Sequence, residues 1–216
     1  MDRGLTLNIF SAVCNLAIFL LVAISIAEFY SAAGGSANMK VKKIRCFEYF
    51  TVDSNILAAV AAFIMLVFNV LGLINGSAIP AWVMHIKFIG SVAVGLTFFV
   101  VMLLLAPYAG YRHMLEGCSL FTHLIVPVLA MLSFICFDGG GILPAYAIAL
   151  ALIPVAVYGA VYFRMVVIVG EDRGGWNDFY GFNKGGKWYL SVIVILLMTL
   201  AIAFLLRLGH NALYAA

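Results

Sequence analysis

Six long apolar segments constrain this chain more than any other feature of its sequence. Each is close to the roughly 20 residues that a helix needs to cross about 30 Å of hydrocarbon. No segment alternates regularly between apolar and polar residues, as the strands of a membrane barrel do. The sequence therefore predicts an all-α, polytopic membrane protein, a single-domain bundle of six transmembrane helices at about residues 5–29, 51–74, 86–106, 120–137, 143–169 and 188–206.

The composition agrees with a membrane-embedded chain. Apolar residues make up 66% of the sequence and charged residues 10%, against roughly 45–50% and about 25% in soluble domains. The first apolar segment is interpreted as a span and not as a cleavable signal peptide. It is longer than the apolar stretch of about 7–15 residues in such a signal, and Asp2 offsets the charge of Arg3.

Lysine and arginine are distributed unequally between the two sides of the predicted bundle. Cytoplasmic loops carry an excess of these residues, which predicts cytoplasmic odd-numbered loops, external termini and, for a bacterial chain, a location in the plasma membrane. Because the basic residues are those that set this topology, the net charge of +3 gives no support for nucleic-acid binding. The side of the odd loops holds Lys40, Lys42, Lys43, Arg45, Arg112, Arg164, Arg173, Lys184 and Lys187, and the opposite side holds Arg3, Lys87 and Arg207.

The four cysteines and four histidines do not form a recognisable ligand set. No C-x-x-C motif and no Cys/His spacing typical of zinc is present, and no pair of histidines has the matching depth that haem ligation requires. We therefore expect no metal and no other cofactor. We expect His85, His113 and His210 to lie at the membrane interface or in exposed positions.

The second span begins with a polar stripe, in the stretch YFTVDSN at residues 49–55. At about 100° per residue, its members share one narrow helix face that is polar at its start and small further in. Polar groups facing hydrocarbon are costly, so the stripe is predicted to point into the bundle. Its members are Thr51, Ser54, Asn55, Ala58 and Ala62.

The fourth span carries His123 in the stretch FTHLIVPVL at residues 121–129. Pro127 has no N–H, so the carbonyl of His123 lacks its helical donor and a bend is predicted there. The second and fourth spans both start on the side of the odd loops. Thr51 and His123 are therefore predicted to lie at a similar depth in the membrane.

The stretches YFTVDSNILAAVAAF and THLIVPVLAML, in this order within a six-span layout, resemble the FAR-type, androgen-induced family of six-span membrane proteins and its bacterial branch. The resemblance covers much of residues 49–163. Animal members hydrolyse fatty acid esters of hydroxy fatty acids with a membrane threonine and histidine. It implies that the corresponding residues here are Thr51 and His123. The first span and the residues from Glu171 onward carry no matching motif.

The implied chemistry is physically consistent. A threonine hydroxyl becomes a useful nucleophile when a base within about 3 Å takes its proton, and neutral histidine suits this role near neutral pH. The first turn of the second span offers free N–H groups, with Asn55 and Ser54 beside them, as a predicted oxyanion site. The acyl chain is then expected along Ala58 and Ala62. The partners in this hypothesis are the lipid bilayer and a lipid-like substrate.

Structural interpretations of the same residues stay open. Thr51 can instead be the N-cap of the second span, with Ser54 and Asn55 bonded to neighbouring helices, and His123 can be a structural histidine. In function, the alternatives are a transporter of small solutes or lipids and a non-catalytic lipid-binding protein. The loop at residues 171–188 has two interpretations, a set of interfacial aromatic residues or a lid or re-entrant segment over a cavity.

Overall fold

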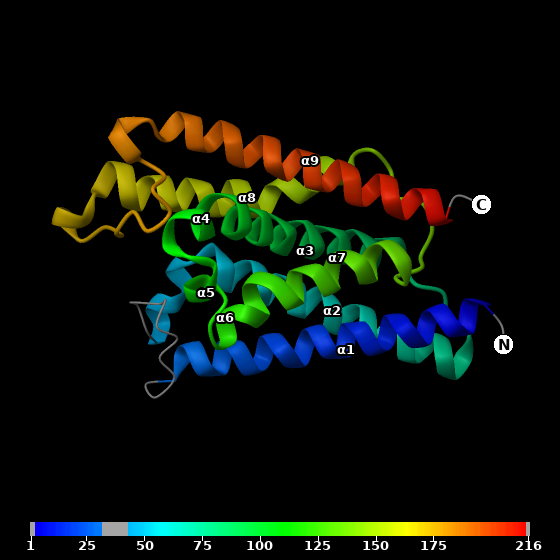
Figure 1. Ribbon diagram of the computed structural model, residues 1–216. Helices are drawn as coiled ribbons and strands as arrows, with labels where there is room; N and C mark the ends of the chain where they lie inside the picture. The colour runs from blue at the N-terminus through cyan, green and yellow to red at the C-terminus, as the bar shows by residue number, and fades with distance from the viewer. Residues whose placement is uncertain (1–2, 32–42, 215–216) are drawn as a thin grey trace.

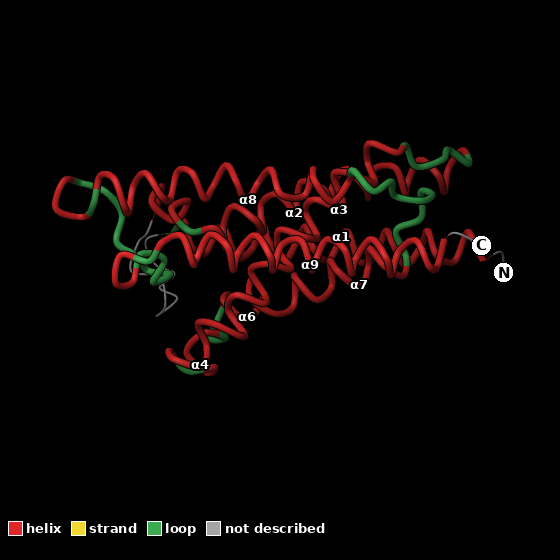
Figure 2. The backbone as a smooth tube through the Cα atoms, turned by 90° about the horizontal axis from the view of Figure 1, so that it is seen from above, coloured by secondary structure: helices red, strands yellow, loops and turns green. Residues whose placement is uncertain are grey.

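The computed structural model describes residues 3–31 and 43–214, and this part of the chain is helical, without strands. Six of its helices are long and apolar enough to cross a membrane, and they run side by side in both views of the backbone (Figures 1 and 2). The predicted all-α, six-helix class is therefore confirmed. Lys40 and Lys42, which contributed to the predicted orientation, lie outside the described residues.

Three of the six spans are uninterrupted α-helices and three contain a π-helical segment. The first, second and sixth spans are α1 (Arg3–Tyr30), α2 (Phe50–Asn75) and α9 (Trp188–Tyr214). The third span joins α3 (Ala81–Phe99), a π segment (Val100–Leu105) and α4 (Ala106–Ala109). The fourth joins α6 (Cys118–Leu120), a π segment (Phe121–Ile125) and α7 (Val126–Cys136), and the fifth joins α8 (Ala147–Phe163) and a π segment (Arg164–Val169).

Short helices lie between the spans, namely Lys43–Glu48, α5 (Tyr111–Met114), Glu171–Arg173 and Lys184–Gly186. The observed spans differ from the predicted ones mainly at three ends. The third begins at Ala81, the fifth begins at Ala147 and the sixth continues to Tyr214. The ends differ because hydropathy marks where the apolar run changes, whereas the backbone hydrogen bonds decide where a helix begins and ends.

Helix α3 is the centre of the bundle. It packs against α2, α7, α8 and α9, while α1 covers α2 and α7. Small residues allow this close packing: a Cβ added at Gly90 would lie 3.1 Å from the Cα of Ala58, and one at Gly95 would lie 3.1 Å from a methyl group of Ile202. Large apolar side chains are exposed along the outer helices, as expected for surfaces that face lipid.

The bend predicted at Pro127 takes the form of a π segment. Pro127 has no N–H to offer the carbonyl of His123, and just before it the N–H of Val126 bonds to the carbonyl of Phe121, five residues back. The wider turn absorbs the missing hydrogen bond without breaking the span. His123 lies within this π segment.

Both described chain ends lie at one end of the bundle, and the segments that precede α2, α6 and α9 lie at the other (Figure 1). Helices α2 and the α6–α7 span therefore both start at the end opposite the termini. This arrangement brings Thr51 and His123 into the same layer of the bundle.

Candidate active site

Thr51 and His123 line the same cavity. This cavity has a volume of about 470 Å³ and lies at the end of the bundle opposite the termini. Its other walls carry charged and polar side chains, including Arg45, Glu48 and Asn177. Arg45 and Glu48 form an ion pair of 2.7 Å at its edge. The structure thus brings together the two residues that the sequence singled out.

The ring of His123 is held by a backbone carbonyl. Its Nδ1 lies 2.7 Å from the carbonyl oxygen of Met114, and because a carbonyl only accepts, we assign the proton of the neutral ring to Nδ1. Nε2 then carries a lone pair. No described residue forms a hydrogen bond with that nitrogen, so it is available to accept a proton in the cavity.

Thr51 is not the N-cap of α2. The N-cap position belongs to Tyr49, which makes no side-chain capping bond, and Thr51 lies within the first turn. The capping interpretation of Thr51 is therefore wrong. The Thr51 carbonyl is held by its neighbours, since it accepts hydrogen bonds from Asn55 at 2.7 Å and Ser54 at 3.2 Å.

Ser54 and Asn55 are buried and link α2 to other helices. The Ser54 hydroxyl lies 2.8 Å from the hydroxyl of Thr97. The side-chain amide of Asn55 donates to the carbonyls of Thr51 and Thr122, at 2.7 and 3.1 Å. Because both amide protons are engaged, Asn55 has none left for an oxyanion. The geometry therefore assigns these two residues to positioning, in place of the predicted oxyanion role.

Ala58 and Ala62 line neither of the two cavities beside Thr51. Both are buried in an apolar cluster with residues of α1, α3 and α7, and Ala58 packs directly against Gly90. Neighbouring helices fill the groove that was expected there for an acyl chain. Small side chains on a helix face permit either a ligand or another helix to approach, and here it is a helix.

A second cavity, of about 350 Å³, adjoins the first on the other side of Thr51. The residues that line both cavities are Thr51, Val101, Leu105 and Tyr180. The walls of the second cavity are largely apolar and come from the third, fifth and sixth spans, with Leu96, Val100, Leu104, Val155, Val194 and Ile195 among them. Thr51 therefore lies between a polar compartment and an apolar one.

The loop between the fifth and sixth spans borders both cavities. Asp178 folds it, because one carboxylate oxygen accepts the N–H of Phe182 and the other accepts the N–H of Asn183, each at 2.8 Å. Phe182 and Tyr180 from this loop form cavity walls. The loop therefore contributes walls to both cavities, and its role as a lid or re-entrant segment stays a prediction. No sequence pattern distinguishes Tyr180 from the other aromatic residues of this loop.

Tyr180 places its hydroxyl beside Thr51. The oxygen is within electrostatic reach of the Thr51 and Tyr158 hydroxyls and of the backbone N–H groups of Phe50 and Thr51. By strict distance and angle, none of these neighbours makes a hydrogen bond with the Tyr180 oxygen. Burial raises the pKa of the Tyr180 phenol to about 12, and the nearby hydrogen-bonding groups offset part of that rise.

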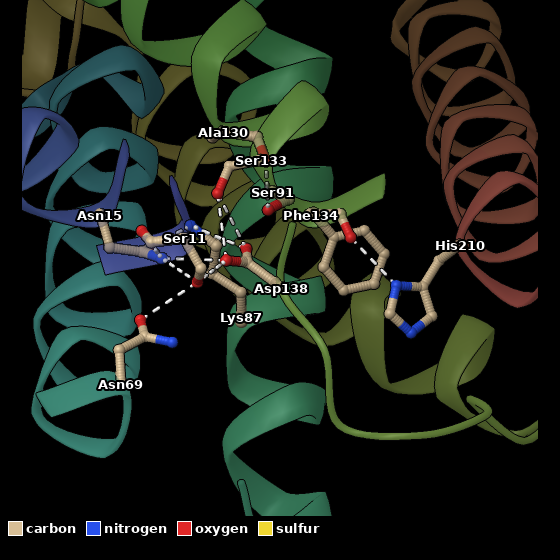
Figure 3. Close-up of polar contacts among 10 residues, drawn as sticks. All are labelled: Ser11, Asn15, Asn69, Lys87, Ser91, Ala130, Ser133, Phe134, Asp138 and His210. Carbon is tan, nitrogen blue, oxygen red and sulfur yellow. Dashed lines mark hydrogen bonds and ion pairs between the residues drawn. The ribbon is translucent and has the colours of Figure 1, made fainter. Parts of the chain in front are cut away.

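A second buried polar cluster lies toward the end of the bundle that holds the termini (Figure 3). Lys87 approaches Asp138 at 3.5 Å and donates to Asn15 at 2.6 Å. Asp138 also accepts hydrogen bonds from Ser11 at 2.6 Å, Asn15 at 2.9 Å and Ser133 at 3.1 Å. Lys87 is 1% exposed, so a basic residue that the sequence assigned to the side of the termini is buried within the bundle. The sequence signal for this cluster is the spacing of Asn8, Ser11 and Asn15 on one face of α1.

The other histidines divide between surface and core. His113 is exposed, as expected. His210 is fully buried, with Nδ1 3.0 Å from the carbonyl of Phe134 and Nε2 3.0 Å from that of Gly141. The prediction of an interfacial or exposed position for His210 is therefore wrong, because α9 continues inside the bundle beyond the apolar run. Within residues 3–31 and 43–214, no group of three or more His, Cys, Asp and Glu side chains is arranged to hold a metal ion.

No protein-family model, curated protein or solved structure matches this chain. The resemblance to the FAR-type, androgen-induced family accordingly rests on the two sequence motifs and stays a prediction.

Proposed function

We propose that this chain is an integral membrane hydrolase of lipid esters, related to the FAR-type, androgen-induced family, with Thr51 as nucleophile and His123 as general base. The observation that carries the proposal is the shared cavity of Thr51 and His123. They come from separate spans. Thr51 also lines the apolar cavity, and the Nδ1 of His123 is hydrogen-bonded to the carbonyl of Met114. The family resemblance and the cavity are independent grounds for the same pair.

In the first half of the reaction, Nε2 of His123 accepts the Thr51 proton as Oγ1 forms a bond to the ester carbonyl carbon. The resulting tetrahedral intermediate breaks its bond to the alcohol oxygen, which takes the proton from His123. In the second half, His123 takes a proton from water, which attacks the acyl-threonine and releases the fatty acid. The Nδ1–H bond to Met114 keeps the required tautomer throughout.

The substrate class follows from the two compartments that meet at Thr51. An acyl chain suits the apolar cavity among the third, fifth and sixth spans. The alcohol part of the ester, with its polar groups, suits the cavity that contains His123 and Arg45. A fatty acid ester of a hydroxy fatty acid has this division, since its alcohol half carries a carboxylate that Arg45 can attract.

The membrane orientation belongs to the same proposal. The lysine and arginine distribution favours a cytoplasmic position for the odd loops. The site then opens on the cytoplasmic side, and in a bacterial cell the protein resides in the plasma membrane.

Turnover of lipid esters by the purified protein in lipid nanodiscs tests the proposal. Thr51→Ala and His123→Ala are each expected to lower kcat/KM by at least about a thousandfold, because the nucleophile and its base act as a unit. Thr51→Ser keeps a hydroxyl and is expected to retain part of the activity. His113→Ala, at an exposed histidine, is the matched control. Wild-type turnover by the Thr51→Ala protein would reject the assignment.

A further inference from the structure

We infer that Tyr180 is a catalytic residue of this site, donating a hydrogen bond from its hydroxyl to the oxyanion that forms when Thr51 attacks an ester. The inference rests on the proposed function and goes beyond it. It names a residue in the loop for which neither the sequence motifs nor the family resemblance assigns a role.

The first ground is an unpaired hydroxyl in a buried place. The oxygen of Tyr180 is inaccessible and makes no hydrogen bond with a described residue. Buried hydroxyl groups are normally paired, and an exception calls for an explanation such as a catalytic role. Tyr180 and Thr51 line both cavities, so the Tyr180 side chain stands beside the place where an ester group would bind at Thr51, with its hydroxyl buried next to that place.

The second ground is the set of donors around the same point. The first turn of α2 has no side-chain cap, and no described carbonyl accepts the N–H groups of Phe50 and Thr51. These N–H groups lie within electrostatic reach of the Tyr180 oxygen. They also stand at the positive end of the α2 dipole. The Tyr180 hydroxyl and the start of α2 therefore place their donors close together beside Thr51.

The other side-chain donors near Thr51 are already engaged. Tyr158 donates its proton to the carbonyl of Glu48 at 2.7 Å. Ser54 and Asn55 bond to neighbouring helices and to the Thr51 carbonyl. Tyr180 is thus the side chain beside Thr51 whose proton has no acceptor among the described residues.

The loop holds Tyr180 in place before any substrate binds. Tyr180 donates its backbone N–H to the hydroxyl of Tyr162 at 3.3 Å, and the Tyr162 hydroxyl lies 3.2 Å from Asp178. Asp178 also fixes the next turn of the loop through Phe182 and Asn183. A donor that is positioned in advance stabilises a developing charge without reorganisation at the moment of reaction.

The step balances without proton transfer from Tyr180. As the bond between Thr51 Oγ1 and the carbonyl carbon forms, the π-electron pair of the carbonyl moves onto its oxygen. Tyr180 and the N–H groups of α2 donate hydrogen bonds to that oxyanion. When the pair returns, the bond to the alcohol breaks, and the alcohol leaves with the proton held by His123. Because the pKa of Tyr180 is raised to about 12, the phenol stays protonated as a donor at neutral pH.

Tyr180→Phe tests the inference, because it removes only the hydroxyl. The expected result is a fall in kcat of about 10²–10³-fold, with KM changed less than about threefold. An alkyl trifluoromethyl ketone, which forms an oxyanionic adduct with the nucleophile, is expected to lose affinity by a similar factor. Thermal unfolding is expected at the wild-type temperature or above it, because the deleted hydroxyl has no partner. Tyr189→Phe, at an exposed tyrosine of α9, is the matched control.

The outcomes separate this inference from the proposed function. Wild-type kcat and ketone affinity in Tyr180→Phe, together with an inactive Thr51→Ala protein, would overturn the role of Tyr180 alone. Activity in Thr51→Ala, or none in the wild type, would overturn both. If Tyr180→Phe fails to fold, 3-fluorotyrosine at position 180 keeps the ring and hydroxyl but lowers the phenol pKa. Loss of kcat at a lower pH than in the wild type is then expected, and an unchanged pH profile would overturn the inference.

Discussion

At the scale of the residue, the site depends on which atoms are held and which are free. The Thr51 carbonyl and the Nδ1 of His123 are fixed by neighbours, at 2.7 Å in each case. No described residue occupies Nε2 of His123 by a hydrogen bond. A nucleophile and base of this kind need rigid frames and unoccupied reacting atoms.

Gly159 offers a test of the apolar cavity. It lines that cavity, and a Cβ added there would meet no atom within 4 Å. Gly159→Leu is therefore expected to fold and to shorten the space for an acyl chain. We expect KM for long-chain esters to rise about tenfold or more, with little change for short-chain esters, in a chain-length series of one ester class.

Gly90→Leu provides the contrasting control, since a side chain there would clash with the backbone of Ala58 at 3.1 Å. It is expected to destabilise the bundle regardless of substrate. An equal effect of Gly159→Leu on short and long chains would contradict the assignment of the apolar cavity to the acyl group.

At the scale of the element, two segments with irregular backbone bring the site together. The π segment of the fourth span carries His123, and the loop held by Asp178 carries Tyr180. Neither segment follows a regular hydrophobic period. Their positions depend on a missing proline N–H in one case and on carboxylate-to-backbone hydrogen bonds in the other.

The Lys87–Asp138 pair connects elements far from the site and has a structural role in our account. Lys87 belongs to α3, Asp138 follows α7, and Asn15 of α1 bonds to both. Lys87→Met leaves the Asp138 carboxylate buried without its cation, which is expected to cost about 3–5 kcal/mol. The double variant Lys87→Met with Asp138→Asn is expected to recover part of this loss.

Thermal or chemical unfolding in one detergent measures both variants, and residual ester turnover should follow the folded fraction. If Lys87→Met keeps its stability but loses turnover per folded molecule, the purely structural account of this cluster is wrong.

At the scale of the whole molecule, the sequence predicted which segments are helices better than it predicted which helices pack against one another. The six spans and the common depth of Thr51 and His123 follow from apolar length and chain order alone. Lateral packing does not follow from them. The prediction of an acyl-chain groove along Ala58 and Ala62 was wrong for that reason. The position of Tyr180 beside Thr51 and the burial of Lys87 with Asp138 were not predicted, because the residues of each pair are distant in the sequence and no periodic pattern connects them.

The central claim is that Thr51 becomes the acylated residue with the help of His123. Mass spectrometry of the protein after reaction with an active-site-directed β-lactone bearing an alkyl chain measures this directly. We expect one acyl adduct on Thr51 in the wild type, at least about a hundredfold slower labelling in His123→Ala, and none in Thr51→Ala. An adduct on another residue, or labelling of Thr51 at an unchanged rate without His123, would contradict the account.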